Sequence, residues 1–345
     1  MNPTTDAALP PGVRADDLPP AALLSQVEAL GDRVGRVRAA IGRVIFGQDE
    51  VVEQVLVTVL SGGHVLLVGV PGLGKSRLVE ALGTVLGLGT KRVQFTPDLM
   101  PADIIGSEVL EEAEGRRGFR FVPGPVFCQL LMADEINRAS PRTQSALLQA
   151  MQEQRVAVGG HDHVLPRPFH VLATQNPIEQ EGTYALPEAQ LDRFLVKVLI
   201  GYPGLEDERR MVAAVVQGKV AADLDVSRVD QVIDQAGLLA MQRGVAAIRM
   251  DPAVTDYAVR IVRATREWPG VIGGAGPRGG LALARLARAR AALDGRDFVV
   301  PDDVRSVVLP ALRHRLLLAP DALLERQRPD DMLGALLHKV AAPKQ

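Results

Sequence analysis

The eight-residue segment Gly69–Ser76 constrains this chain more than any other, because it matches the pattern G-x-x-x-x-G-K-[ST] in full. Residues 64–68 before it form a short apolar run that predicts a buried strand, and residues 77–82 after it have helical character. A strand, this loop and a helix in that order form a phosphate cradle, since glycines let backbone N–H groups approach a polyphosphate and the helix N-terminus adds its positive dipole end. An accidental glycine-rich turn is disfavoured by these flanking elements.

Within the cradle, the side chains that follow the last glycine have separate roles. Lys75 is placed to reach the β- and γ-phosphates, and the Ser76 hydroxyl is placed to ligate Mg²⁺. The residues predicted to contact the nucleotide here are Gly69, Val70, Pro71, Gly72, Leu73, Gly74, Lys75, Ser76 and Arg77.

The pattern of strands and helices predicts an α/β fold. Four more short apolar segments, at residues 92–95, 129–133, 169–174 and 194–198, indicate strands, and helical patterns lie between several of them. Short apolar strands separated by helices imply a mainly parallel sheet that is covered on both faces. Strand signals stop after residue 204 and helical patterns follow, so we expect a domain boundary near residue 203.

Composition excludes several classes of protein. The formal net charge of −2 argues against a protein that binds nucleic acid along its whole surface. A single cysteine, Cys128, excludes a disulfide framework and a cysteine metal cluster, and its apolar surroundings predict a buried thiol. No apolar stretch is long enough to span a membrane, and the proline-rich first 20 residues predict a disordered tail with no signal peptide. These observations predict a cytoplasmic protein.

Polar side chains follow two of the predicted strands. Asp134 and Glu135 come directly after residues 129–133, and Asn176 follows residues 169–174. Ligands of open parallel sheets bind beyond the carboxyl ends of the strands. Asp134 is therefore placed to hold the Mg²⁺ shell and Glu135 to polarise the attacking water. The alternatives are a pair of solvated acids that cap the next helix and, for Asn176, an Asn-Pro turn.

The segment 134–139 (Asp-Glu-Ile-Asn-Arg-Ala), found at this distance after the phosphate cradle, resembles the MoxR family of AAA+ ATPases, and the likeness extends from about residue 20 to 340. It implies an AAA+ core at 21–203, with a five-stranded parallel sheet flanked by helices, and a smaller all-α lid domain at 204–345. It also implies a helix-2 insert at about 111–122 and a hairpin at about 155–169, both directed toward the axial pore of a ring. From the residues alone, a solvated surface excursion is the better interpretation of each. Asn176 then corresponds to sensor 1, which positions the lytic water.

The resemblance also implies that the active site is shared between subunits. The segment 186–194 is similar to the arginine-finger segment, in which Arg193 would reach the γ-phosphate bound by a neighbour. From the residues alone, a surface ion pair is the better interpretation of this arginine. Arg138 is a rival or additional contact across the boundary.

Two further segments of the resemblance surround the nucleotide. Gly276-Pro277-Arg278 resembles sensor 2, in which Arg278 would reach from the lid to the nucleotide of the same subunit. Gly276 and Gly279 depart from the family pattern, and we expect looser lid closure from them. Gly47 lies in a segment that resembles the backbone contact to adenine.

The hairpin at 155–169 carries His161 and His163, which strand spacing puts on one face. A metal pair is one interpretation. We favour exposed residues at the hairpin tip, because no carboxylate or cysteine set completes a site.

The resemblance implies a hexameric ring that binds ATP and Mg²⁺, hydrolyses ATP, and remodels or matures a protein client, typically one that bears a von Willebrand factor A domain. Alternatives are a DNA-acting AAA+ motor, a chelatase motor subunit and a nucleotide-binding scaffold without turnover. The net charge and the lack of a recognisable DNA-binding module count against the DNA-acting motor. The presence of Glu135, Asn176 and Arg193 counts against the scaffold without turnover.

Overall fold

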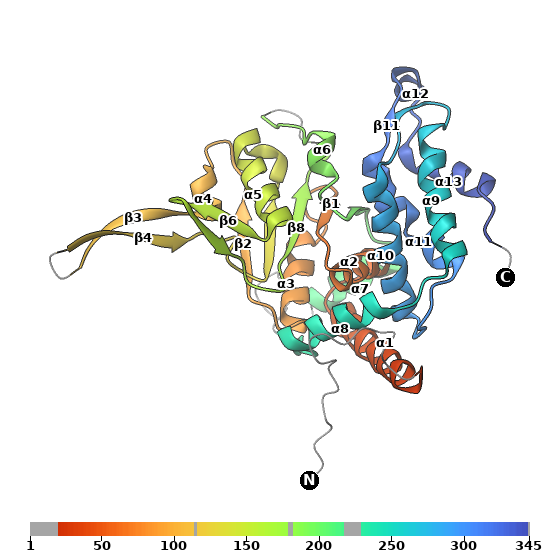
Figure 1. Ribbon diagram of the computed structural model, residues 1–345, viewed down its shortest axis with the longest axis horizontal. Helices are drawn as coiled ribbons and strands as arrows, with labels where there is room; N and C mark the ends of the chain where they lie inside the picture. The colour runs from red at the N-terminus through yellow and green to blue at the C-terminus, as the bar shows by residue number, and fades with distance from the viewer. Residues whose placement is uncertain (1–19, 114–115, 179–181, 217–228, 344–345) are drawn as a thin grey trace, which may run out of the picture. The chain divides into compact units, whose positions relative to one another are not determined.

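The computed structural model describes residues 20–113, 116–178, 182–216 and 229–343 (Figure 1). The predicted tail at 1–20 therefore lies outside the described residues except for its last position. The described chain divides into two compact units. The α/β unit comprises Ile41–Val52 and Gly62–Asp230, and the helical unit comprises the described residues within Met1–Ala40, Glu53–Ser61 and Gln231–Gln345. The helix that follows the last strand of the sheet thus belongs to the α/β unit, whereas the expected boundary near 203 would assign it to the lid.

Strands and helices alternate along the α/β unit. The strands are β1 Val65–Val68, β2 Thr90–Gln94, β3 Gly106–Ala113, β4 Arg116–Pro123, β5 Leu130–Asp134, β6 Arg155–Val158, β7 His161–Val164, β8 His170–Gln175 and β9 Val196–Leu199. The helices are α3 Lys75–Val85, α4 Pro101–Ile105, α5 Pro141–Glu153, α6 Glu188–Leu191 and α7 Leu205–Val216, with a 3-10 turn at Ile136–Arg138. Helices α1 (Pro20–Gly42) and α2 (Asp49–Leu60) each contribute residues to both units.

The central sheet has five parallel strands in the order β2-β5-β8-β1-β9, which confirms the predicted sheet. Strands β1, β5 and β8 lie in the interior and are buried over almost their full length, whereas β2 is largely exposed at the edge. In register, Val68 pairs with Gln175, and Ala133 pairs with Ala173. The carboxyl ends of β1, β5 and β8 therefore lie side by side.

One face of this sheet carries the main hydrophobic core of the unit. Helix α5 contributes Leu147, Leu148 and Met151 to it, against Leu131 and Val171 of the sheet. Helix α3 packs against β5 and buries Leu78, Val79 and Leu82. Since the strands are covered by helices, their apolar runs have little alternation, as the sequence shows.

Two antiparallel hairpins extend from the sheet region. Strands β3 and β4 pair from Gly106 with Pro123 to Ala113 with Arg116, and they project well beyond the sheet (Figure 1). The predicted insert at about 111–122 is thus the outer part of a longer hairpin. Within the predicted hairpin at 155–169, Arg155–Val158 and His161–Val164 pair as the antiparallel strands β6 and β7.

The two hairpins touch through aromatic rings. Phe121 on β4 stacks on His163 on β7, with ring centroids 3.7 Å apart and ring planes 16° apart. Phe121 also contacts Phe127 edge-on at 5.4 Å. His161 is exposed as expected, but His163 is partly buried, so the prediction of an exposed tip residue is wrong for His163.

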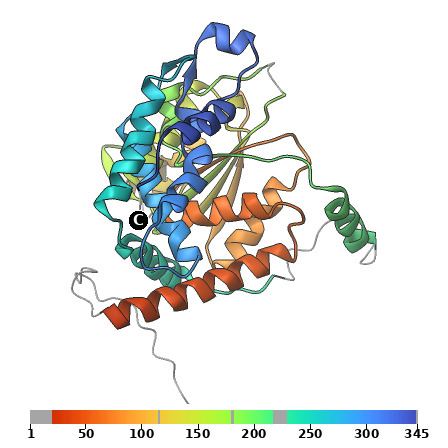
Figure 2. The same ribbon diagram turned by 90° about the vertical axis from the view of Figure 1, so that its right-hand side faces the viewer.

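The helical unit is built around a layer of helices. Its elements, besides parts of α1 and α2, are α8 Gln235–Ala247, α9 Pro252–Arg266, α10 Pro277–Leu293, α11 Pro301–Leu312, a 3-10 turn at Arg313–Arg315, α12 Pro320–Leu324, α13 Pro329–Lys339, and the short strands β10 Val271–Gly273 and β11 Leu317–Leu318. Helix α10 packs against α8, α9 and α11 (Figures 1 and 2). The antiparallel pair β10–β11 corrects the expectation of no strand after residue 204, because strands this short leave no periodic signal.

Within the described parts of the chain, no helix is both long enough and apolar enough to cross a membrane.

Candidate active site

The phosphate cradle Gly69–Ser76 lies between β1 and α3, as predicted. Gly72 and Gly74 have φ angles of +85° and +74°, which residues with a Cβ rarely adopt. Lys75 opens α3, and its Nζ donates to the Gly69 carbonyl oxygen at 2.5 Å and to the Val70 carbonyl oxygen at 3.3 Å. The ammonium group therefore sits inside the loop.

Charge at the cradle is balanced by the neighbouring acids. Burial lowers the pKa of Lys75 from its ordinary value, and the negative charges of Asp134 and Glu135 act in the opposite direction. A cation, a left-handed glycine loop and a helix N-terminus together fit a polyphosphate.

The two acids at the end of β5 each pair with an arginine of the same chain. Asp134 is only 13% exposed, and its Oδ2 accepts a hydrogen bond from Arg92 Nη2 at 2.6 Å. Glu135 accepts at Oε2 from Gln94 Nε2 at 2.9 Å and from Arg138 Nη1 at 3.0 Å. Glu135 stands in a left-handed backbone conformation with φ 54° and ψ 51°, which is strained for a residue with a Cβ. The interpretation of these acids as solvated helix caps is therefore disfavoured.

Asn176 follows β8 at the same edge of the sheet. The Gly69 N–H donates to the Gln175 carbonyl oxygen at 3.2 Å, so Asn176 lies next to the start of the cradle. It is 5% exposed, and its Oδ1 accepts from the Ile178 N–H at 3.1 Å. Asn176 thus both begins a local turn and stands at the rim of the site, so the two interpretations of it are compatible.

The two candidate arginines differ in their surroundings. Arg138 pairs with Glu135 within the chain. Arg193 is partly buried in the turn between α6 and β9, and among the described residues no hydrogen bond or ion pair of its guanidinium is found. The surface ion pair that the sequence favours for Arg193 is therefore not seen in the part of the chain that the structure describes.

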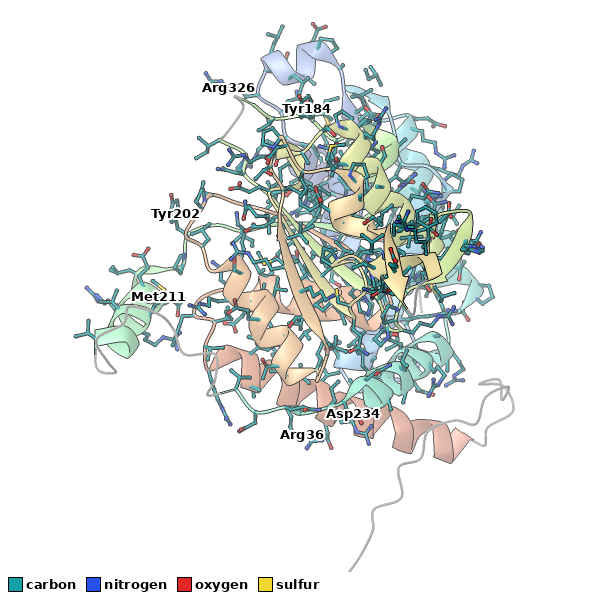
Figure 3. The ribbon with its side chains drawn as sticks, turned by 90° about the vertical axis from the view of Figure 1, so that its left-hand side faces the viewer. Arg36, Tyr184, Tyr202, Met211, Asp234 and Arg326 are labelled. Atoms are coloured by element: carbon teal, nitrogen blue, oxygen red, sulfur yellow. The ribbon has the colours of Figure 1, made fainter. Side chains whose placement is uncertain are left out.

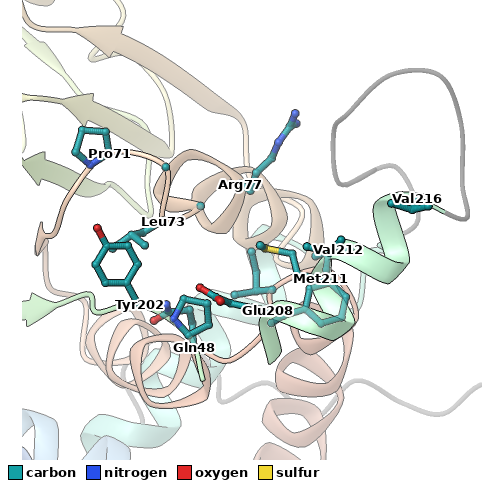
Figure 4. Close-up of a pocket in the computed structure, with 15 residues that line it drawn as sticks. Gln48, Pro71, Leu73, Arg77, Tyr202, Glu208, Met211, Val212 and Val216 are labelled. Carbon is teal, nitrogen blue, oxygen red and sulfur yellow. The ribbon is translucent and has the colours of Figure 1, made fainter. Parts of the chain in front are cut away.

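A pocket of about 520 Å³ opens beside the cradle. Figure 4 shows Tyr202 beside Leu73 and the side chains of α7 along another wall, and Figure 3 places Tyr202 just before α7 and Met211 on it. The lining is mostly apolar: Val44, Ile45, Phe46, Gln48, Pro71, Gly72, Leu73, Gly74, Arg77, Tyr202, Pro203, Glu208, Met211, Val212 and Val216. An apolar pocket with few polar groups next to a phosphate cradle suits a nucleotide base.

Gly47 positions the backbone at this pocket. Its φ is +64°, and an added Cβ would lie 2.7 Å from Asp207 and 2.8 Å from Pro203. Gln48, the next residue, donates from Nε2 to the Gly201 carbonyl oxygen at 2.9 Å, which ties this segment to the one after β9.

Gly47→Ala is therefore expected to weaken nucleotide binding about tenfold or more, because a Cβ at this φ forces the 46–48 segment away from residues 203–207. Titration with a fluorescent ATP analogue measures the change. Gly35→Ala is the matched control, since an added Cβ there meets no atom within 4 Å. Unchanged affinity in Gly47→Ala would contradict a role for this segment at the pocket.

The predicted sensor 2 residues belong to the helical unit. Arg278 is exposed in the first turn of α10, after Gly276 and Pro277. An added Cβ at Gly279 would lie 3.1 Å from Leu312 and 3.2 Å from Ala275, so this glycine allows close packing of α10. At Gly276 an added Cβ meets no atom within 4 Å.

Outside the cradle, other candidate sites find no support. Among the described residues, no group of three or more His, Cys, Asp or Glu side chains could hold a metal ion, so the pair His161 and His163 remains without further ligands. Cys128 is buried, and burial raises the pKa of its thiol to about 11, which makes it unreactive.

Several residues of the site were not predicted from the sequence. Arg92 and Gln94 lie two positions apart on edge strand β2 and so point to the same side as the acids they contact. Thr174 is a polar residue in the buried run of β8, and a buried hydroxyl needs partners. A polar residue inside an apolar, buried run is therefore the sequence signal that points to Thr174.

Family models match both units of the chain. Residues 64–196 match the model described as ATPase family associated with various cellular activities (AAA). Residues 263–335 match the model of an AAA lid domain.

Characterised and uncharacterised relatives cover most of the chain. The chain is 44% identical to Chaperone MoxR1 of Mycobacterium tuberculosis over 314 residues. The matched region covers 88% of this chain and 81% of the relative. The chain is 41% identical over 318 residues to the uncharacterized protein YeaC of Bacillus subtilis, with 92% and 97% covered. Protein MoxR of Methylorubrum extorquens is 33% identical over 344 residues, with 90% and 96% covered. A crystal structure from Cytophaga hutchinsonii superposes with a TM-score of 0.85 at 33% identity, covering 94% of this chain and 99% of the other.

Proposed function

The chain belongs to the MoxR family of AAA+ ATPases, and we propose on this premise that its α/β unit binds ATP with Mg²⁺ and hydrolyses it to ADP and phosphate. The observation that carries the proposal is the meeting of three features at the carboxyl edge of one sheet: the cradle after β1, Asp134 and Glu135 at the end of β5, and Asn176 after β8. This is the arrangement that phosphoryl transfer to water requires.

Each residue has a defined task in this proposal. Backbone N–H groups of the cradle and Lys75 hold the phosphates, with the base in the pocket lined by Tyr202 and Met211. Ser76 and Asp134 would hold Mg²⁺, which neutralises phosphate charge when bound. Two protein ligands are enough, because Mg²⁺ keeps several waters and phosphate oxygens around it.

Hydrolysis needs a polarised water and a stabilised transition state. Glu135 accepts the proton of the attacking water, and Asn176 orients that water. Arg193 completes the site of a neighbouring copy in a ring, for which a hexamer is the expected form, and it stabilises the charge on the transferred phosphoryl group. Arg278 contributes from the lid of the same chain.

The output of this cycle is a chaperone-like remodelling or maturation of a protein client, which the family resemblance suggests bears a von Willebrand factor A domain. The two joined hairpins are the proposed contact surface. Leu110 and Phe119 pair across β3 and β4 and are 58% and 73% exposed, so they form an exposed apolar pair on the projecting hairpin. A cytoplasmic location stays a prediction.

A steady-state ATPase assay over a range of protein concentrations tests the proposal. We expect Mg²⁺-dependent phosphate release whose rate per subunit rises with concentration, since the site needs a neighbour. Lys75→Ala is expected to lose nucleotide affinity and turnover together. No phosphate release at any concentration would contradict the proposal, and stimulation by DNA but not by protein partners would favour a DNA-acting motor.

A further inference from the structure

A threonine hydroxyl is buried in the middle of the sheet, directly behind the two acids. Thr174 is 0% exposed in β8, between the fully buried Ala173 and the partly buried Gln175, and it pairs in register with the buried Leu67 of β1. A hydroxyl at such a position is unfavourable unless both its proton and its lone pairs find partners.

Both partners of this hydroxyl belong to the proposed catalytic acids. Thr174 Oγ1 donates its proton to Asp134 Oδ1 at 2.6 Å, and it accepts the backbone N–H of Glu135 at 2.8 Å. Because a hydroxyl has one proton and an ionised carboxylate can only accept, the direction of both bonds follows. The chain of bonds therefore runs from the Glu135 amide through Thr174 to Asp134, and each bond strengthens the other.

The bond from Glu135 restrains a strained residue. Glu135 has a left-handed backbone, which a side chain with a Cβ disfavours, and this backbone sets the direction in which its carboxylate leaves the strand end. The Glu135 N–H bond to Thr174 and the Arg138 N–H bond to the Glu135 carbonyl oxygen, at 2.9 Å, fix the peptide groups on either side. Thr174 is thus positioned to hold Glu135 in this conformation.

We propose that Thr174 is a positioning residue for hydrolysis: its hydroxyl ties the Glu135 backbone to Asp134 and so keeps the proposed base and the proposed metal ligand in one geometry. This inference rests on the proposed function, since it concerns the same site. Thr174 acts through Glu135 and Asp134, the two residues that its hydroxyl contacts.

The test compares Thr174→Ser with Thr174→Ala, which differ from each other only by the hydroxyl. Loss of an orienting partner of this kind typically lowers activity roughly 10–100-fold. We expect kcat for ATP to fall by about that factor in Thr174→Ala, while Thr174→Ser keeps most of it. Affinity for a fluorescent ATP analogue should stay within about twofold in both, because the cradle and the base pocket do not involve Thr174. Thr174→Val, which has the same shape, should behave like Thr174→Ala.

A double-mutant cycle separates positioning from a general effect on folding. In a Glu135→Gln background, Thr174→Ala should reduce single-turnover hydrolysis by a smaller factor than in the wild type, because the part of its effect that runs through the Glu135 carboxylate is already lost. A further loss of similar size, or equal kcat in the Ser and Ala variants, would overturn the inference. If Thr174→Ala does not fold, the wild type, Thr174→Ser and Thr174→Val give the same comparison. An inactive wild type, or an active Glu135→Gln variant, would instead count against the proposed function.

Discussion

Glu135→Gln is expected to lower the rate of ATP hydrolysis roughly 10²–10⁴-fold, while the variant still binds ATP. Glutamine has the same length as glutamate, and its amide oxygen can still accept from Gln94 and Arg138, so the loop keeps its contacts. The amide cannot take a proton from water, and ATP should therefore stay bound and intact. Identification of the nucleotide that co-purifies with the variant, by chromatography after denaturation, measures this outcome.

A matched control keeps the result specific. Glu153→Gln makes the same chemical change at the end of α5, where Glu153 accepts from Gln149 and lies away from the cradle. It should turn over ATP like the wild type. Recovery of ADP from Glu135→Gln at the wild-type rate would show that another group activates the water.

Arg193→Ala is expected to bind ATP normally and to lose turnover by roughly 10³–10⁵-fold. Among the described residues, the guanidinium has no hydrogen bond or ion pair, so its removal should leave the fold of its own chain intact. Phosphate release measured over a range of protein concentrations, together with the affinity for a fluorescent nucleotide, tests both parts of the prediction. Arg36→Ala, at an exposed arginine of α1, is the control for loss of a surface charge (Figure 3).

Mixing two inactive variants tests whether Arg193 acts across a subunit boundary. In an equimolar mixture of Arg193→Ala and Glu135→Gln, some sites combine an intact Glu135 from one chain with an intact Arg193 from the next. These sites should hydrolyse ATP although neither variant does so alone. A mixture as inactive as its components would contradict action in trans.

Much of the sheet was predictable because its strands are buried on both faces and leave continuous apolar runs. The common edge for Asp134, Glu135 and Asn176 was predictable for a related reason, since parallel strands all end on the same side. The first strand of the long hairpin, Gly106–Ala113, was not predicted as a strand. It is mostly exposed and rich in glutamate, so it lacks the apolar alternation that marks a half-buried strand.

The contacts inside the site were beyond sequence reasoning. Arg138 pairs with Glu135 of its own chain, a contact that the sequence does not indicate. His163 was expected at an exposed tip, and it stacks on Phe121 of the other hairpin instead. Each of these outcomes depends on how a turn bends and on which strands lie beside each other.

The sequence by itself determined that a phosphate cradle joins a buried strand to a helix at Gly69–Ser76, and that two acids and an asparagine end neighbouring strands. These are local patterns, set by side-chain periodicity and by the conformations that glycine permits. Only the tertiary structure decided that Thr174 bridges Asp134 and Glu135, residues about 40 positions away in the chain. The reason is strand register: parallel pairing brings positions of unrelated sequence within hydrogen-bond distance, and periodicity alone does not specify which positions meet.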